Sequence, residues 1–284
     1  MKYNLDLVED ISNILAQDFW VYCNFVSAMI PEISDPIKFT SNCSIFVKEG
    51  EGKIEIDLIS YDIKAPCIVN IQQGQIIQNA EVNKNIDAYV IVLSKRFCDN
   101  LFLLLQECPA YSVTTRCPVV SVKPSLIEKF NKFYSHISDI FASSKDSDAY
   151  QAMVFAIASF FYECGTKCYY PLMDTLPKNQ SRLPEKFISL VQQNFKNERF
   201  LEFYATRLDV TTKHLSRILK SLTGFTGVEW IDRYVILEAK VLLRSTNLTI
   251  QQISDELNFS SQSLFGKYFK KQTGMTPKEF RNGQ

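Results

Sequence analysis

The sequence predicts an α+β protein in which a β-rich domain with added helices, residues 1–170, precedes an all-α domain, residues 185–284. Three observations lead to this fold class. Short strand-like apolar segments fill residues 43–93, helical periodicity begins after Lys95, and a proline-rich linker at residues 171–184 separates the two parts. The length of 284 residues allows two hydrophobic cores, because single cores usually stop growing at about 250 to 300 residues.

The β-rich part consists of short apolar segments separated by turn residues, a pattern typical of an antiparallel sheet. The expected strands are residues 43–47, 53–59, 67–71, 75–78 and 88–93. Near the start of the chain, Phe19, Trp20 and Tyr22 form an aromatic cluster, with Phe25 close behind. Such a cluster is more often part of a core than the lining of an effector pocket.

Helical segments follow the strands. Residues 97–106 read as a first helix, and residues 124–142 and 148–164 repeat apolar residues at i, i+3 or i+4, and i+7. The last of these segments is apolar over more than one stripe, so we expect burial by the sheet on one side and by the partner subunit of a homodimer on the other. His136 has no Ser or Asp partner at a catalytic spacing, and we assign it a structural role.

Charge is distributed unevenly between the two predicted domains. The formal charge of the chain is zero, but residues 182–284 contain 16 Lys and Arg against 10 Asp and Glu, which leaves +6 in this part and −6 before it. A basic domain joined to an acidic one suits a module that binds a polyanion, because each neutralised phosphate releases condensed counterions.

Several classes of protein are excluded by what the sequence lacks. Its eight cysteines include no Cys-x-x-Cys pair and it has two histidines, so we expect no metal site and no cofactor. It has no Gly-rich phosphate loop and no nucleophile elbow, and we expect no catalytic residues and no enzyme activity. Apolar runs stay below the roughly 18 residues of a membrane span, and the first residues do not resemble a secretion signal, so a cytoplasmic location without membrane contact is expected.

The second domain is predicted to be helical throughout. Its expected helices are residues 185–195, 200–208, 212–222, 227–244, 250–257, 262–272 and 277–280. An internal repeat relates the segment that starts at Leu201 to the segment that starts at Ile250. The matched residues are Leu201 and Ile250, Tyr204 and Ile253, Leu208 and Leu257, Val210 and Phe259, Leu215 and Phe265, Leu219 and Phe269, Lys220 and Lys270, Thr223 and Thr273, and Gly224 and Gly274. Apolar matches fall where two crossed helices would share a core.

Each repeat predicts a short helix, a tight turn and a second helix. Asp209 and Asn258 stand at the turns, and these two residue types best tolerate a left-handed backbone besides Gly. Thr and Ser residues that follow can accept hydrogen bonds from the free N–H groups of the second helix. Gly224 and Gly274 supply a left-handed residue at its end. Both units therefore read as helix-turn-helix motifs.

The polar residues on the outer face of each second helix are candidates for contact with DNA. A helix in the major groove presents outward side chains near its N-terminus while its opposite face packs on the first helix. Arg and Lys suit guanine edges, and Gln suits adenine. The candidates are Lys213, Ser216 and Arg217 in the first unit and Gln262, Ser263 and Lys267 in the second. We expect His214 to pack or to cap the helix.

The segment EAKVLLRSTNLTIQQISDELNFSSQSLFGKYFKKQTGMTPKEFR resembles the signature of the AraC/XylS family, and the likeness extends back to about Arg199. It implies two helix-turn-helix units that contact successive major-groove segments, preceded by a cupin-like sensing or dimerisation domain. The family's base-reading positions match the six residues above. Two departures are Asn258, where the family usually has Gly, and Val235, where it often has Arg.

These observations predict a sequence-specific DNA-binding transcriptional regulator. Its expected partners are double-stranded promoter DNA, a small-molecule effector, a second copy of the chain and RNA polymerase. One alternative keeps the DNA-binding domain as a targeting device while the N-terminal half binds another protein. An ordinary seven-helix bundle with a basic surface is the alternative for the second domain.

Overall fold

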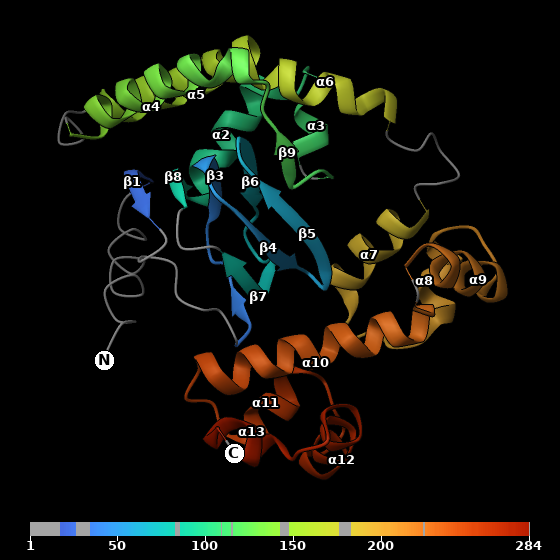
Figure 1. Ribbon diagram of the computed structural model, residues 1–284. Helices are drawn as coiled ribbons and strands as arrows, with labels where there is room; N and C mark the ends of the chain where they lie inside the picture. The colour runs from blue at the N-terminus through green and yellow to red at the C-terminus, as the bar shows by residue number, and fades with distance from the viewer. Residues whose placement is uncertain are drawn as a thin grey trace. The chain divides into compact units, whose positions relative to one another are not determined.

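The computed structural model describes residues 18–26, 35–82, 86–108, 110–114, 116–142, 148–175, 183–223 and 225–283. The chain divides into two compact units, which are described separately. The first unit comprises Met1–Ser34 and Lys38–Leu176, and the second comprises Asp35–Ile37 and Pro177–Gln284. The α+β class is confirmed, since strands dominate the first part of the chain and helices the second (Figure 1).

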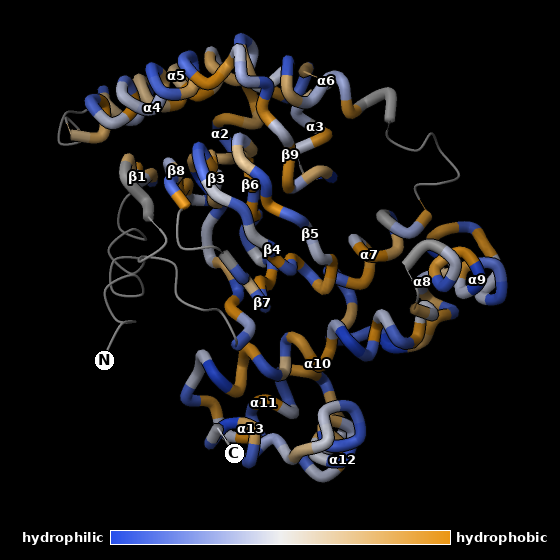
Figure 2. Tube along the Cα trace, viewed as in Figure 1, coloured by the Kyte–Doolittle hydropathy of each residue, from blue (hydrophilic) through white to orange (hydrophobic). Residues whose placement is uncertain are grey.

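Two antiparallel sheets form the first unit. One sheet has the strand order β1-β8-β3-β6-β9, and the other has the order β2-β7-β4-β5. The strands are β1 (Phe19–Val26), β2 (Ile37–Lys38), β3 (Asn42–Glu49), β4 (Glu51–Ile56), β5 (Ile59–Lys64), β6 (Cys67–Ile71), β7 (Ile76–Val82), β8 (Asp87–Leu93) and β9 (Val119–Ser121). A core that includes Val47, Ile56, Val69 and Ile77 is shared by strands of both sheets. Figure 2 shows hydrophobic residues within the strands of both sheets.

The predicted strand at residues 53–59 is divided by a tight turn. Asp57 and Leu58 have φ angles of 50° and 70°, and they join β4 to β5 as a hairpin. The Asp57 carboxylate accepts a hydrogen bond from the backbone N–H of Ile76 at 2.9 Å and one from the side-chain amide of Gln75 at 2.9 Å. Bonds to β7 and to the loop before it therefore hold a turn that the alternating sequence pattern conceals.

The aromatic cluster near the start of the chain belongs to a strand. β1 pairs antiparallel with β8, with Phe19 opposite Leu93. The Phe19 ring is buried and lies edge-on to Phe97, with ring centroids 5.8 Å apart. The expectation that this cluster packs in the core is confirmed for Phe19.

A helical layer covers the outer face of the five-stranded sheet (Figure 1). It comprises α2 (Lys95–Leu105), α3 (Tyr111–Thr114), the 3₁₀ turn η2 (Pro124–Leu126), α4 (Ile127–Ala142), α5 (Ala149–Phe160), the π-helical turn η3 (Phe161–Gly165) and α6 (Thr166–Thr175). Helix α6 continues through Pro171 to Thr175, whereas the sequence places the linker from residue 171. Cys168 and Tyr169 are buried, so packing holds this helix on its unit and outweighs the penalty of an internal proline.

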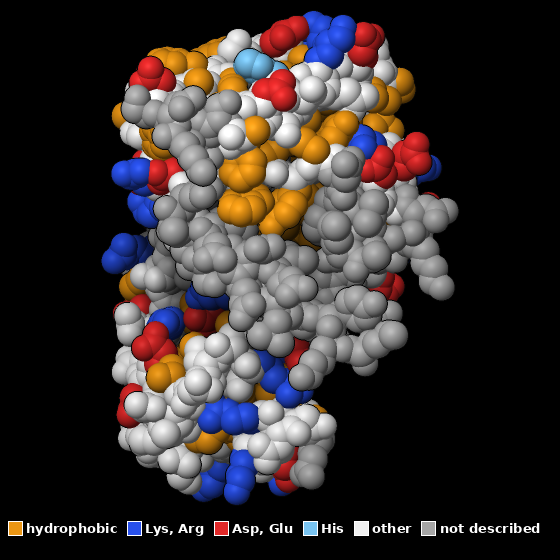
Figure 3. Space-filling model, turned by 90° about the vertical axis from the view of Figure 1, so that its left-hand side faces the viewer, with side chains coloured by type: hydrophobic (Ala, Val, Ile, Leu, Met, Phe, Trp, Pro, Cys, Tyr) orange, Lys and Arg blue, Asp and Glu red, His pale blue; other side chains and the backbone are white. Residues whose placement is uncertain are grey.

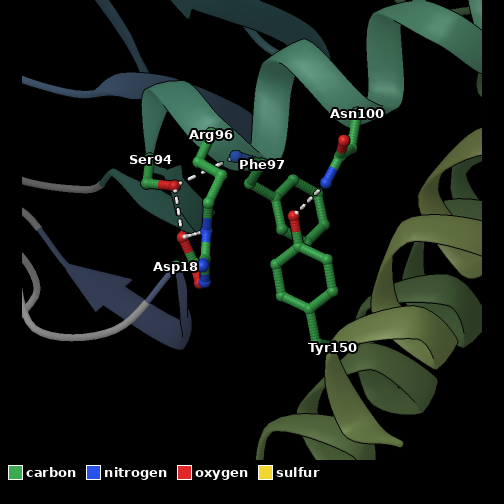
Figure 4. Close-up of polar contacts among 6 residues, drawn as sticks. All are labelled: Asp18, Ser94, Arg96, Phe97, Asn100 and Tyr150. Atoms are coloured by element: carbon green, nitrogen blue, oxygen red, sulfur yellow. Dashed lines mark hydrogen bonds and ion pairs between the residues drawn. The ribbon is translucent and has the colours of Figure 1, made fainter.

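The start of α2 is fixed by polar contacts with Asp18, which directly precedes β1, and with α5 (Figure 4). The Ser94 hydroxyl accepts a hydrogen bond from the backbone N–H of Phe97 at 3.1 Å and donates one to the Asp18 carboxylate at 2.8 Å. The same carboxylate forms an ion pair with Arg96. One turn further along, the Asn100 amide donates a hydrogen bond to the Tyr150 hydroxyl at 2.7 Å. These contacts set the position of α2 against its neighbours.

The second unit contains seven helices among its described residues, as the sequence predicts. They are α7 (Leu183–Asn194), α8 (Leu201–Arg207), α9 (Thr212–Thr223), α10 (Gly227–Ser245), α11 (Ile250–Glu256), α12 (Gln262–Thr273) and α13 (Pro277–Asn282). Helix α10 has 19 residues and contacts α7, α9, α11, α12 and α13. Its many buried residues, among them Trp230, Val235 and Ala239, make it the common support of the unit. No helix among the residues that the structure describes is long and apolar enough to cross a membrane.

Candidate nucleic-acid interface

Each helix-turn-helix unit has a small core formed by the repeated apolar residues. In the first helix-turn-helix unit, Tyr204 on α8 and Leu215 and Leu219 on α9 are fully buried. In the second, Ile253 and Leu257 lie at one side of the core and Phe265 and Phe269 on α12 at the other, and all four are fully buried. The repeat therefore has a structural basis, because matched positions occupy equivalent places in two similar helix pairs.

The turns have the predicted backbone conformation. Asp209 has a φ angle of 55° and Asn258 one of 54°, so both residues are left-handed. Gly274 ends α12 with a φ angle of 84°. Gly224, its counterpart in the first helix-turn-helix unit, lies outside the described residues. An Asn in place of the family's usual Gly leaves the second turn intact.

Side-chain caps fix where the second helix of each unit begins. The Thr211 hydroxyl accepts a hydrogen bond from the backbone N–H of His214 at 3.2 Å. The Ser261 hydroxyl accepts one from the backbone N–H of Leu264 at 3.3 Å. Each cap satisfies an N–H group that lacks a partner within its helix. The first turns of α9 and α12, which carry the candidate residues, are therefore ordered by their own sequence.

Helix α12 is attached to α10 by a polar cluster around Asp232. The Tyr268 hydroxyl donates a hydrogen bond to the Asp232 carboxylate at 2.7 Å, and the Gln272 amide donates another at 2.9 Å. Burial raises the pKa of Tyr268, and the hydrogen bond to Asp232 raises it further, so this phenol stays a donor. These contacts orient the outer face of α12 relative to α10.

Helix α10 itself starts with a capping box. The Thr226 hydroxyl accepts from the backbone N–H of Glu229, and the Glu229 carboxylate accepts from the backbone N–H of Thr226 at 2.7 Å. These bonds lower the pKa of Glu229, since they favour its ionised form. Two turns along, Val235 is buried where the family often has Arg, and the guanidinium of Arg233 lies 3.9 Å from the centroid of the Phe225 ring.

The six predicted contact residues lie on the two helices in equal number. Lys213 and Arg217 on α9 are exposed, and Ser216 between them is half-buried. Gln262, Ser263 and Lys267 on α12 are all exposed. Five of the six side chains are thus exposed, and Figure 3 shows Lys and Arg side chains on the surface of the C-terminal unit.

Three further residues on these helices were missed by the reading of single positions. His214 is exposed, and its ring nitrogen Nδ1 lies 3.2 Å from the guanidinium of Arg217. Leu264 exposes 51% of its surface, and a Cβ added at Gly266 would meet no atom within 4 Å. The sequence predicts that His214 packs or caps the helix; its side chain is exposed and does not pack, and its backbone N–H donates to the Thr211 hydroxyl that caps α9.

The repeat itself was the signal that could have found these residues. In the alignment of the two repeats, His214 corresponds to Leu264 and Ser216 corresponds to Gly266. An outward position in one unit is thus an outward position in the other, whatever its residue type. An exposed Leu or Gly is not polar, so residue type alone does not mark it as a candidate.

Two similar helix pairs, supported by one long helix and presenting basic and polar side chains from each second helix, define a DNA-binding protein of the double helix-turn-helix class. The profile of a family described as "Helix-turn-helix domain" matches residues 204–283. The HTH-type transcriptional activator AarP of Providencia stuartii is 31% identical over 102 residues, which cover 36% of this chain and 76% of AarP. The chain therefore belongs to the AraC/XylS family of transcriptional regulators.

Other relatives differ in how much of the chain they share. The HTH-type transcriptional activator CsvR of Escherichia coli is 23% identical over 257 residues, or 87% of this chain and 90% of CsvR. The chain spans only 8% of histidine kinase P4 of Formosa agariphila, which is 30% identical over 109 residues. Among solved structures, ToxT of Vibrio cholerae covers 94% of this chain and 98% of its own at 15% identity, with a TM-score of 0.46.

Proposed function

We propose that the protein is a sequence-specific transcriptional regulator whose helices α9 and α12 enter successive segments of the major groove. The observation that carries this proposal is the pair of capped helices with exposed basic residues, both packed on α10. With 19 residues, α10 is about 28 Å long at ~1.5 Å per residue. One turn of DNA measures roughly 34 Å, so a support of this length suits two helices in adjacent grooves.

The candidate residues divide by chemistry. Arg217 and Lys267 occupy matched positions in the repeat and suit the acceptor atoms of guanine. Gln262 suits adenine, while Lys213 and the two serines can bind bases or phosphates. Leu264 adds an apolar side chain at the position equivalent to His214, and it suits the methyl group of thymine. The two units then read different sequences.

The test is a binding experiment with the full chain. Footprinting of the purified protein on genomic DNA identifies its sites, and gel-shift titrations then measure affinity at several salt concentrations. We expect protection of two segments about one helical turn apart, and a logarithm of affinity that falls linearly with the logarithm of salt concentration. Equal affinity for identified sites and for random DNA would contradict the proposal.

For the N-terminal compact unit, the first unit of the fold, we propose a sensing role, a dimerisation role or both. Phe155 on α5 and Leu103 on α2 are exposed hydrophobic residues of the helical layer, with 59% and 63% of their surface accessible. A homodimer through the helical layer would cover such residues. Sedimentation of the full chain and of a Phe155→Glu variant measures this directly. A monomer at every concentration would leave sensing as the role of this unit.

RNA polymerase is a further partner that the relatives suggest. AarP and CsvR are named transcriptional activators, and an activator on this chain's promoter sites would have RNA polymerase as a partner. Transcription in vitro from an identified site, with and without the protein, gives the sign of regulation. If the first unit instead binds another protein, thermal-shift screening of the full chain with small molecules gives no stabilisation.

A further inference from the structure

The first unit contains a cavity of about 550 Å³ between the five-stranded sheet and the helical layer. Its lining comes from β3, β6 and β8 on the sheet side and from α2, α3, α4, α5, η3 and α6 on the helix side. Protein interiors are close-packed, and voids larger than a water molecule are few. This volume lies within the ~300–1,000 Å³ range of small-molecule sites.

The sheet leaves this space because a small side chain, Ser44, stands at the centre of a row. Ser44 on β3 is opposite Asn70 on β6 and opposite Ile91 on β8, and all three line the cavity. Two residues further along β3, on the same face, Phe46 is fully buried and stacks on Phe130 with ring centroids 4.4 Å apart. A large ring thus fills the space at one position, and a hydroxymethyl group leaves it open at the other.

The helix side of the cavity is a wall of aromatic rings. Phe133 and Phe160 stack with centroids 3.9 Å apart and an interplanar angle of 6°, and Phe130 lies edge-on to Phe160 at 4.8 Å. These rings hold one another in place before any ligand arrives. A preformed wall of flat surfaces favours a ligand that is itself flat, because aromatic rings pack well in stacked or edge-on arrangements.

The described residues that line the cavity offer polar groups but no unpaired charge. Lys95 and Asp99 are its two charged residues, both exposed at the mouth, and they pair with each other at 2.8 Å. Deeper in, the Asn70 amide donates to the Tyr169 hydroxyl at 2.5 Å. Burial raises the pKa of the Cys98 thiol to about 12, so this lining group is neutral as well. An ion without a partner would lose its hydration on entry and gain no counter-charge.

One wall of the cavity coincides with the irregular turn in the helix. Phe161 and Gly165, the first and last residues of η3, both line it. A Cβ at Gly165 would come within 2.6 Å of the Phe161 ring, so this close approach needs Gly. Single π-helical turns are frequent at functional sites. Helix α6 follows directly and is the last element before the linker to the DNA-binding unit.

We propose that this cavity binds an uncharged, largely apolar small molecule with at least one flat ring and a hydrogen-bonding group. Ser44, Asn70 and the aromatic wall form the site. Such a ligand also contacts η3, which is followed along the chain by α6 and then by the DNA-binding unit. The inference rests on the sensing role proposed for the first unit, and it adds the place of the site and the class of ligand.

Two fluorescent probes that differ by one charge test the proposal in the full chain. N-phenyl-1-naphthylamine is neutral, and 8-anilinonaphthalene-1-sulfonate is the same skeleton with a sulfonate group. We expect saturable binding of one neutral probe per chain, with the sulfonate bound about ten-fold or more weakly. Equal affinity for the two probes at this site would overturn the assignment to an uncharged ligand.

Substitutions locate the probe. Ser44→Phe adds a ring inside the cavity, and Ser60→Phe adds the same ring at an exposed position of β5. Ile157→Trp fills the cavity from the helix side and is the second variant in case Ser44→Phe does not fold. We expect about ten-fold weaker binding of the neutral probe in both filled variants and unchanged binding in Ser60→Phe. Unchanged binding in a folded filled variant would overturn the proposal, as would a crystal structure with the probe elsewhere.

Gel-shift titration of the same preparations separates this inference from the proposed function. Probe binding that fails while the protein still recognises its DNA sites contradicts the cavity site alone. DNA recognition that fails while the neutral probe binds in the Ser44-dependent manner contradicts the proposed regulator and leaves the cavity site standing.

Discussion

The guanidinium of Arg199 lies 3.7 Å from the centroid of the Phe259 ring, and it also donates a hydrogen bond to the backbone carbonyl of Leu257. Arg199 precedes the first helix-turn-helix unit, while Leu257 and Phe259 flank the turn of the second. Burial lowers the pKa of Arg199, as expected for a charge taken partly out of water. This side chain therefore links the segment that leads into the first unit directly to the turn of the second.

We expect Arg199→Ala to lower the stability of the DNA-binding domain by about 2 kcal/mol, because it removes a partly desolvated cation–π contact and a charged hydrogen bond. Arg199→Lys should recover less than half of this loss, since an ammonium lacks the planar face. Trp230 is buried in α10, so its fluorescence in a Trp20→Phe background follows unfolding of this domain by urea. Arg207→Ala, which removes an exposed arginine 5.0 Å from the Phe203 ring, is the control and should cost about 0.5 kcal/mol or less. Equal losses in the two variants would contradict the linking role.

Asn258 is expected to discriminate between alanine and glycine. Its φ angle of 54° is costly for most residues with a Cβ. The next residue, Phe259, packs on Phe265 and holds the turn in place. Asn258→Ala should lower stability by about 1 kcal/mol, and Asn258→Gly should change it by less than about 0.5 kcal/mol. The same urea titration measures both variants. A larger loss for Gly than for Ala would show that backbone conformation is not what Asn258 provides.

The matched residues Arg217 and Lys267 are expected to contribute to specific binding. Replacement of either with Ala should cost about 1–3 kcal/mol on an identified site and relax the sequence preference at one position. Lys186→Ala on α7 is the control, because it removes an exposed positive charge in the same unit and changes no residue of α9 or α12. Gel-shift titration on the preferred site and on single-base variants measures both quantities. A uniform loss on every sequence would assign the residue to phosphate contact.

Leu264 predicts contact with a thymine methyl group. Because 51% of its surface is exposed, Leu264→Ala should leave folding nearly unchanged and weaken specific binding by about 1 kcal/mol. Replacing thymine with deoxyuridine removes only the methyl group. One such replacement in the site should weaken DNA binding by the unsubstituted protein. It should not weaken DNA binding by the Leu264→Ala variant any further. Additive losses at every thymine would contradict the contact.

The fold of the second unit could be predicted almost completely from the sequence, because its signals are local. The segment expected to be helical at residues 212–222 is observed as Thr212–Thr223, and that expected at 262–272 as Gln262–Thr273. Apolar periodicity, capping hydroxyls and left-handed Asp, Asn or Gly residues act within one or two turns of chain. The six candidate contact residues follow from the same periodicity and remain predictions until DNA binding is measured.

The sequence by itself thus determined the family, the two helix-turn-helix units and five of the nine strands described in the N-terminal unit. Tertiary structure decided the rest. It divided residues 53–59 by a turn held through Asp57, carried α6 past Pro171, and exposed Leu264 and His214 beside the predicted polar residues. It also left a cavity at Ser44, whose small side chain has consequences only because Asn70, Ile91 and the aromatic rings meet around it. Contacts between residues far apart in the chain produce these features, and the periodicity of a single segment cannot predict such contacts.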